Sequence, residues 1–240
     1  IKTVFAFNEN DIWFDPWFHW NGQNIQELLV DPVFIGVGVN KLWGTSSNDL
    51  YAIGNNGLIA HYDGRSWSKI ESGTELSIYD IHGAWNSKLK GWEIIAIASS
   101  TQTRENEVIQ IQSKNKVNVL DKTGLSPFST GIWFVPERQY YVVGSGIHRK
   151  RRLSDGRWSV YGPGEVTNYA SSAIDGQSTN DIFVVGSYCE VVHYNGSTWY
   201  NYRNEIPMGD GAFGVVKLKG NTVVIGGYVD RYAVALIGRR

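Results

Sequence analysis

The chain has 240 residues, of which 42% are hydrophobic and 19% are charged, and its formal net charge is −1. This balance creates no overall field that would attract nucleic acid or an anionic membrane, and no apolar run is long enough for a membrane-spanning helix. A single cysteine, Cys189, excludes an internal disulfide. A chain of this length can still bury a large core without cross-links.

A repeated phrase indicates the architecture. Residues 48–54 (NDLYAIG) and 180–186 (NDIFVVG) match, and second matches follow at residues 60–67 (AHYDGRSW) and 192–199 (VHYNGSTW). Weaker copies continue through the chain, so that the first aligned residues are 11, 49, 93, 139, 181 and 221. The gaps between them are therefore 38, 44, 46, 42 and 40 residues. Short strands repeated at this period are typical of β-propellers.

Each repeat is predicted to form a four-stranded antiparallel blade. In the second repeat an innermost strand ends at Thr45, a strand follows at residues 50–54, and a turn at residues 55–57 leads to a third strand. Asp63-Gly64 is a two-residue hairpin signal before the fourth strand at residues 67–71. We predict an all-β, single-domain, six-bladed propeller with blades at approximately residues 1–38, 39–79, 80–128, 129–170, 171–211 and 212–240.

The last repeat is shorter than the others. It supplies three strand-like segments, at residues 214–218, 222–228 and 232–237, and no fourth. Blade six is therefore predicted to have three strands and an exposed edge. Unpaired edges recruit other strands, so strand addition by a partner protein is expected there.

The second repeat resembles a known group of proteins. The run Trp43-Gly44-Thr45, followed by residues 48–54 and 60–67, is similar to the repeats of bacterial β-propeller proteins that are mostly predicted to be secreted or to be lipoproteins. The resemblance covers essentially residues 4–240 and implies the propeller fold. Some members carry a glucosyltransferase label, although this sequence shows no nucleotide-sugar site. A chain that starts at Ile1 rather than Met suggests a removed leader, so we expect an extracytoplasmic location: secreted, periplasmic or cell-surface lipoprotein.

Residues that recur in the repeat are interpreted as structural. Four histidines at one repeat position stand in separate blades, too far apart to share a metal ion, and each is expected to bond a backbone carbonyl. The recurring aspartates are expected to bond their own turns. The recurring tryptophans are expected to pack between blades, with sugar stacking as the alternative. These sets are His19, His61, His148 and His193; Asp11, Asp49 and Asp181; and Trp67, Trp158 and Trp199.

Departures from the repeat are the candidate binding residues. Innermost strands line the axis of a propeller, and their aligned positions begin with Phe5 and continue with two tryptophans and two ionisable residues. Residues 99–107 (SSTQTRENE) form a predicted long loop on one rim, where binding tends to occur. The candidate ligand-binding residues are therefore Trp43, His82, Trp133, Asp175 and Arg104. Local hydrogen bonding of the two ionisable residues is the alternative.

A basic run replaces the apolar third strand in blade four. Residues 148–152 read HRKRR, and alternation sends their cations to both faces of the strand. The candidate patch for an anionic partner is Arg149, Lys150, Arg151 and Arg152, with a solvated strand edge as the alternative.

The sequence thus favours a non-catalytic module that binds a protein or a glycan. It contains no phosphate-binding loop, no nucleophile elbow and no Cys-x-x-Cys pair, so no catalytic residue, metal ligand or cofactor is assigned. Two alternatives remain open. One is a carbohydrate-active enzyme that uses the channel mouth, and the other is a structural subunit of a surface assembly.

Overall fold

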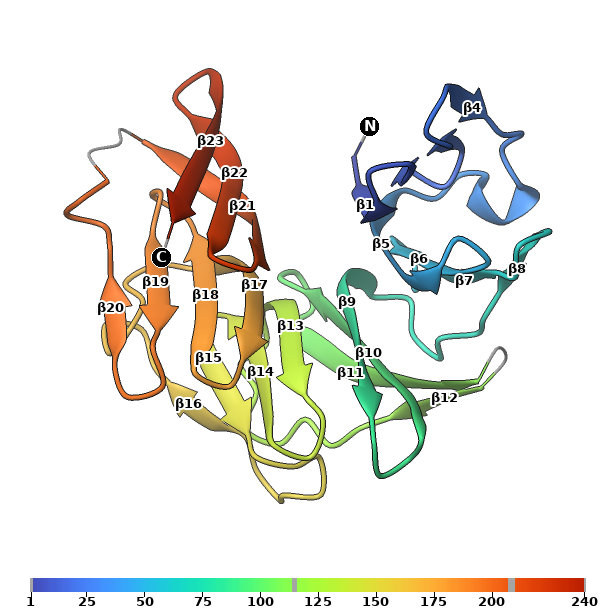
Figure 1. Cartoon of the computed structure of the whole chain (residues 1–240). Helices are drawn as coiled ribbons and strands as arrows, with labels where there is room; N and C mark the ends of the chain where they lie inside the picture. Colours follow the sequence, from blue (N-terminus) through green and yellow to red (C-terminus); the bar gives the residue numbers. More distant parts are fainter. Residues whose placement is uncertain (1, 114–115, 207–209, 240) are drawn as a thin grey trace. The chain divides into compact units, whose positions relative to one another are not determined.

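The computed structural model describes residues 2–113, 116–206 and 210–239 and shows a six-bladed β-propeller (Figure 1). Five blades have four strands and the last has three, as the repeat predicts. Successive strands pair antiparallel within each blade. The described part of the chain contains one short 3-10 turn, Pro32–Phe34, besides the strands. Ile1 and Arg240, the ends of the predicted first and last blades, lie outside the described residues.

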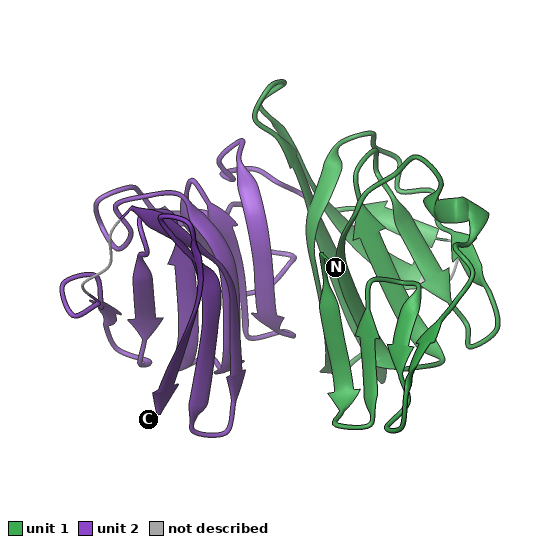
Figure 2. Cartoon of the chain, turned by 90° about the horizontal axis from the view of Figure 1, so that it is seen from above, with its two compact units in different colours: residues 1–120 green, residues 121–240 purple. Residues whose placement is uncertain are grey.

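The chain divides into two compact units, residues 1–120 and 121–240, each holding three blades (Figure 2). The first unit contains β1 (Val4–Asn8), β2 (Asp11–Phe14), β3 (Phe18–Trp20), β4 (Ile25–Glu27), β5 (Val39–Ser46), β6 (Asp49–Gly54), β7 (Ile59–Tyr62), β8 (Trp67–Lys69), β9 (Ser77–Asn86), β10 (Gly91–Ser100), β11 (Glu105–Ser113) and β12 (Lys116–Val119). The second contains β13 (Ser129–Val135), β14 (Gln139–Gly144), β15 (Gly146–Lys150), β16 (Ser159–Tyr161), β17 (Ser171–Ser178), β18 (Asp181–Gly186), β19 (Val191–Tyr194), β20 (Trp199–Asn201), β21 (Gly211–Lys219), β22 (Thr222–Val229) and β23 (Tyr232–Arg239).

The core of each unit lies between neighbouring blades. Strand β6 is buried along nearly its whole length, and Leu50, Ala52 and Ile53 are fully buried. Their side chains divide between two clusters, because alternate residues of a strand face opposite sides. Strand β18 does the same in the second unit with Ile182, Val184 and Val185. A blade therefore has two apolar faces, and each needs a neighbour to cover it.

The hairpin between the third and fourth strands has four residues rather than the two that Asp63-Gly64 suggested. Tyr62 pairs with Trp67, and the Asp63 N–H donates to the Ser66 carbonyl. The Asp63 carboxylate accepts from the N–H groups of Arg65 and Ser66, so it closes the turn locally. Its counterpart Asn195 accepts the matching hydrogen bonds from the N–H groups of Ser197 and Thr198 in blade five.

The predicted third blade is also corrected. Residues 99–107 are not a long loop, because Ser99 pairs with Asn106 and Ser100 pairs with Glu105 across β10 and β11. Only residues 101–104 form the turn, and Arg104 takes a positive φ of 58° there. The extra residues of this blade lengthen its strands instead of forming a binding loop.

Blade six ends in a strand with one neighbour. Within the described residues β23 pairs only with β22, whereas β7 of blade two lies between β6 and β8. Tyr232 and Ile237 of β23 are 75% and 70% exposed. An apolar strand is thus left at a sheet edge.

Amide hydrogen exchange should reveal this edge. We expect the outward amides of β23 to exchange faster than the amides of β7, because an unpaired N–H is open to water while a laddered one must wait for local opening. The measurement is residue-resolved exchange on the isolated chain. Equal protection of the two strands would contradict the open edge.

Candidate ligand-binding site

The five aligned positions of the innermost strands share one register in the structure. Each faces the same position of the second strand of its blade, and the pairs are Phe5 with Trp13, Trp43 with Tyr51, His82 with Ile95, Trp133 with Tyr141, and Asp175 with Phe183. The predicted alignment of these positions is therefore confirmed by strand pairing.

Four of the predicted ligand-binding residues belong to two copies of one packing arrangement, in which a tryptophan ring covers a glycine of the next blade. In the first copy, Trp43 is 7% exposed, and a Cβ built on Gly83 would lie 2.2 Å from its ring. In the second copy, Trp133 is 3% exposed, and a Cβ on Gly176 would lie 2.8 Å from its ring. His82 and Asp175 directly precede these glycines. The buried indoles have no open face for a ligand to stack on.

Asp175 has a structural role. It is 7% exposed, its Oδ2 accepts a 2.9 Å hydrogen bond from the Leu218 N–H, and its Oδ1 lies 3.5 Å from the Lys217 Nζ. The carboxylate thus joins β17 to β21 of the next blade. His82 is half-buried on β9, within the first unit.

Arg104 lies exposed on the β10–β11 turn. A hollow of about 710 Å³ lies beside this hairpin and is lined by residues 73–77, Tyr79, residues 99–103, Glu105 and Glu107. Arg104 is not among its lining residues. The hollow carries three glutamates and no cation, so it offers no positive charge to an anionic ligand.

The recurring histidines and aspartates bond each other, which corrects the partners expected from the sequence. In blade two the His61 Nε2 donates to the Asp49 Oδ1 at 2.6 Å. The same bond is 2.8 Å from His19 to Asp11 in blade one and 3.0 Å from His193 to Asp181 in blade five. Each histidine ring also packs on the aromatic ring opposite, at 4.5, 4.6 and 4.1 Å for blades two, one and five. Their role is therefore structural, as predicted.

His148 does not belong to this set. It pairs with Val142, while Arg149 pairs with Tyr141 and occupies the position of His61 and His193. The one-residue offset sends His148 to the other face of the strand. Its Nε2 accepts a 3.0 Å hydrogen bond from the Ser126 N–H, and burial lowers its pKa to about 4, against a smaller opposing effect of the Val142 backbone.

Blade four therefore lacks the histidine–aspartate pair. Gln139 stands where blades two and five have Asp49 and Asp181, and Arg149 stands where they have histidine. The Gln139 Nε2 donates to the Lys150 carbonyl at 3.0 Å. The Arg149 guanidinium lies over the Tyr161 ring, 4.7 Å from its centroid.

A hollow opens where this pair is missing. Its volume is about 430 Å³, and it lies between blades four and five, entirely within the second unit. Its cations are Arg138, Arg149 and Arg151, and its one anion is Glu137. The remaining lining residues are Gln139, Tyr141, Thr179, Asn180, Tyr194 and Gly196. A second hollow of about 310 Å³ shares Arg149 and Arg151 and adds Arg157 and Asp155.

The predicted basic patch is rearranged by the fold. The Lys150 side chain is 1% exposed, its Nζ lies 3.1 Å from the Asp121 Oδ2, and it sits 5.3 Å from the centroid of the Trp158 ring. Hydrogen bonds from Thr123, and then from Lys150, hold the pKa of Asp121 at about 2. Lys150 therefore faces the interior, and Arg151 and Arg152 are the exposed members of the run.

Packed aromatic residues form part of the wall of this hollow. Tyr141 is 3% exposed, and burial, followed by its neighbour Tyr194, raises its pKa to about 12. Its phenol is thus uncharged at neutral pH. Trp199 packs on Tyr161 and Tyr194 with centroid distances of 6.3 and 5.1 Å. The recurring tryptophans Trp67 and Trp199 are half-buried and Trp158 is 2% exposed, in agreement with a packing role.

Arg138, Tyr141 and Asn180 of this hollow were not singled out by the sequence analysis. The sequence does contain a signal for the hollow, because blade four has lost both the aspartate and the histidine of the repeat, at residues 139 and 149. This loss was missed because His148 was aligned with the histidine position of the repeat. Among the described residues, no cluster of histidine, cysteine and carboxylate groups could hold a metal ion. No helix in the described ranges is long and apolar enough to cross a membrane.

Comparisons with known proteins find similarity in structure rather than in sequence. No protein-family model matches the chain, and no curated protein matches it. YCF48 bound to D1 peptide is similar with a TM-score of 0.73 and 13% identity, over 99% of this chain and 76% of that one. YCF48 from Cyanidioschyzon merolae has a TM-score of 0.68 at 13% identity, over 97% and 80% of the two chains. A gluconolactonase-family propeller has a TM-score of 0.61 at 13% identity, over 97% and 82%. At these identities the likeness shows the fold.

Acidification should destabilise the chain through His148. Its pKa is about 4 when folded and 6.5 as the ordinary value, so the unfolded state takes up the proton first as the pH falls. This stabilisation is complete above pH 6.5 and decreases towards pH 4, and by pH 5 the loss is about 2 kcal/mol. His148→Gln keeps an acceptor for Ser126 and should flatten the decrease between pH 7 and pH 5 in denaturant titrations. Equal pH dependence in both proteins would contradict this role.

Proposed function

We propose that this propeller is a non-catalytic, extracytoplasmic binding module that holds an acidic segment of a protein partner in the hollow between blades four and five. The observation that carries the proposal is the set of three arginines around one hollow. They are Arg138, Arg149 and Arg151, and with Glu137 they leave a net charge of +2. The hollow volume of about 430 Å³ falls within the usual range of ligand pockets.

The residue type favours carboxylates. A guanidinium group is planar and always charged, and its two parallel N–H groups match the two oxygens of a carboxylate. Stacking on Tyr161 fixes the plane of Arg149, so less side-chain entropy is lost when a ligand binds. Gln139, Thr179 and Asn180 add uncharged polar groups that could bond a peptide backbone.

The aromatic residues favour a peptide over an acidic glycan. Sugar rings are held by exposed aromatic faces, whereas Tyr141 is 3% exposed. Tyr194 is half-buried, its ring packs on Trp199, and its hydroxyl donates to the Gly196 carbonyl at 2.9 Å. A peptide partner also agrees with the peptide bound by YCF48, a protein of similar fold.

Binding of labelled peptides tests this proposal. The probes are a fluorescein-labelled Gly-Asp-Glu-Asp-Glu-Gly peptide and its Asn/Gln counterpart, followed by fluorescence anisotropy. We expect the acidic peptide to bind more tightly, and its affinity to fall with added salt because the contacts are charged. Arg149→Glu with Arg151→Glu should weaken binding at least about tenfold, since two attractive charges become repulsive.

Arg65→Glu is the matched control. Arg65 is exposed on the β7–β8 hairpin of blade two, the place that corresponds to the end of β15, and it should leave peptide binding unchanged. Arg65→Glu reverses half as many charges as the double variant, so a loss of binding free energy in proportion, half that of the double variant, would reduce the effect to net charge and contradict a specific hollow. Binding of a sulfated glycan in place of the acidic peptide, abolished by the same arginine changes, would also contradict the peptide assignment.

A further inference from the structure

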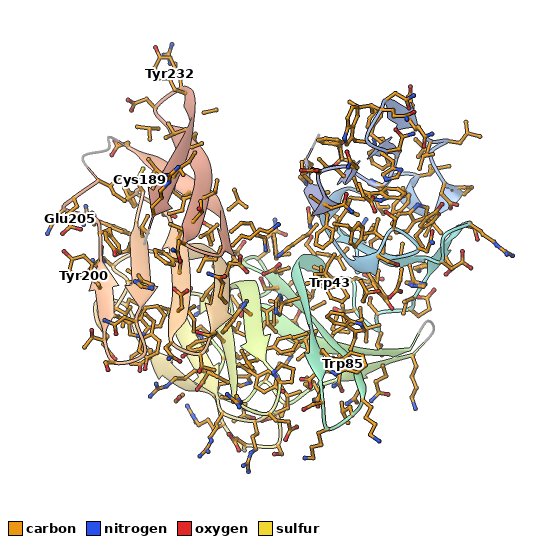
Figure 3. All side chains as sticks on the ribbon, in the orientation of Figure 1. Trp43, Trp85, Cys189, Tyr200, Glu205 and Tyr232 are labelled. Carbon is orange, nitrogen blue, oxygen red and sulfur yellow. The ribbon has the colours of Figure 1, made fainter. Side chains whose placement is uncertain are left out.

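The hairpin between β9 and β10 exposes large apolar side chains. Trp85 is 56% exposed, Leu89 is 62% exposed and Trp92 is 46% exposed, all within eight residues of the chain. Trp85 is on β9, shortly before the turn that leads to β10 (Figure 3). Exposed apolar residues are ordinary when single, but a cluster of them marks an interaction surface.

The hairpin is held rigidly. Asn86 is 1% exposed, and its Oδ1 accepts from the N–H groups of Lys88 and Leu89. Its Nδ2 donates to the buried Glu93 carboxylate at 2.6 Å. The β9–β10 pairing continues through Glu93, Trp92 and Gly91, beyond the last pair of β10 with β11 at Ile94. The hairpin therefore projects past the rest of its blade without losing order.

An aromatic ladder connects this tip to the core of the first unit. The ring of Tyr51 lies 6.0 Å from that of Trp43, Trp43 lies 5.7 Å from Trp92, and Trp92 lies 6.1 Å from Trp85. Tyr51 and Trp43 are buried, while the two outer indoles are about half exposed. The outer indoles are thus supported from beneath and their exposed parts face solvent.

Blade three alone has this composition at its first hairpin. The matching turns of blades one, two, four and five carry the polar residues Asn10, Asn48, Arg138 and Asn180. Blade three instead reads WNSKLKGW over residues 85–92, with a leucine between Lys88 and Lys90. The fold does not demand these residues, since four other blades connect their first two strands by shorter turns without them.

We propose that this hairpin docks on the interface of an anionic lipid bilayer. Tryptophan has an apolar body and a polar N–H and gathers at the headgroup level, while an exposed leucine at the apex can enter the acyl boundary. Lys88 and Lys90 are exposed residues that flank that leucine, and their local positive charge is attracted by anionic headgroups although the net charge of the whole chain is −1. The two indole planes cross at 85°, so they do not form the flat platform that would suit a sugar.

The test places a fluorescent reporter at the apex. Cys189, the one native cysteine, is buried, so Leu89→Cys gives a single accessible thiol for an NBD label. The probe is a vesicle of phosphatidylcholine with about 30% phosphatidylglycerol, and pure phosphatidylcholine is compared, because the anionic lipid supplies the attraction. We expect NBD emission to rise and shift to the blue with the anionic vesicles and much less with the neutral ones.

The controls separate insertion from adsorption. NBD at Gln102→Cys, on the β10–β11 turn at the opposite end of the same strand, should not respond. In unlabelled protein, Trp85→Ser with Trp92→Ser should reduce vesicle co-sedimentation at least about tenfold, while Tyr228→Ser, at a residue 55% exposed elsewhere, should not.

Binding should survive Arg149→Glu with Arg151→Glu, so this result is independent of the peptide hollow. The absence of vesicle binding would overturn the proposal, as would equal responses at both labels. Capture of a glycan or a protein by the same hairpin, without vesicle binding, would also overturn it.

Discussion

In each unit an indole of one blade rests on the backbone of the next blade. Trp43 covers Gly83 and Trp133 covers Gly176, and a Cβ at either glycine would overlap the ring. Neither glycine has a positive φ, so the requirement is for space rather than for backbone freedom. A blade has two apolar faces and gains stability only when neighbours cover them, so this close approach sets the spacing that the remaining core residues fill.

A second recurring interaction, a hydrogen bond between a histidine and an aspartate, stabilises individual blades. The hydrogen bond from histidine to aspartate in blades one, two and five joins the third strand to the start of the second, and the histidine ring covers the aromatic residue opposite. The hollow between blades four and five lies where blade four lacks this histidine–aspartate pair. Where Gln139 and Arg149 replace the pair, the space is not filled, and arginines surround it. The hollow thus arises without any change in strand topology.

Much of the fold could be predicted because it depends on period and turn chemistry. Two matching phrases set the repeat, and the register of Trp43, Trp133 and Asp175 agrees with the alignment. The partners of individual side chains could not be predicted. His148 and Arg149 differ by one residue in sequence but lie on opposite faces of β15, and only strand pairing decides which one occupies the repeat position.

Only part of the candidate site could be predicted from the sequence, because the partners of individual side chains depend on the fold. The basic run in the sequence indicated Arg149 and Arg151 correctly. Lys150 of the same run does not contribute to the surface, because its ammonium group is buried, pairs with Asp121 and lies over the Trp158 ring. Arg138 joins from a different hairpin, and no spacing rule connects it to the run. Residues 99–107 look like a loop by composition, yet Ser99 pairs with Asn106 and both residues are buried, so tertiary packing overrides the weak strand preference of these polar residues.

The direct test of the packing account is the stability of two alanine variants. Gly83→Ala places a methyl group against Trp43 and should lower the free energy of unfolding by about 1–3 kcal/mol, as overpacked cores do. Gly156→Ala is the matched control, since nothing lies within 4 Å of its Cβ and its φ is not positive. Denaturant unfolding should show a lower midpoint for Gly83→Ala and little change for Gly156→Ala. Equal midpoints for both variants and the wild type would contradict the claim that the indole–glycine contact sets the spacing of the blades.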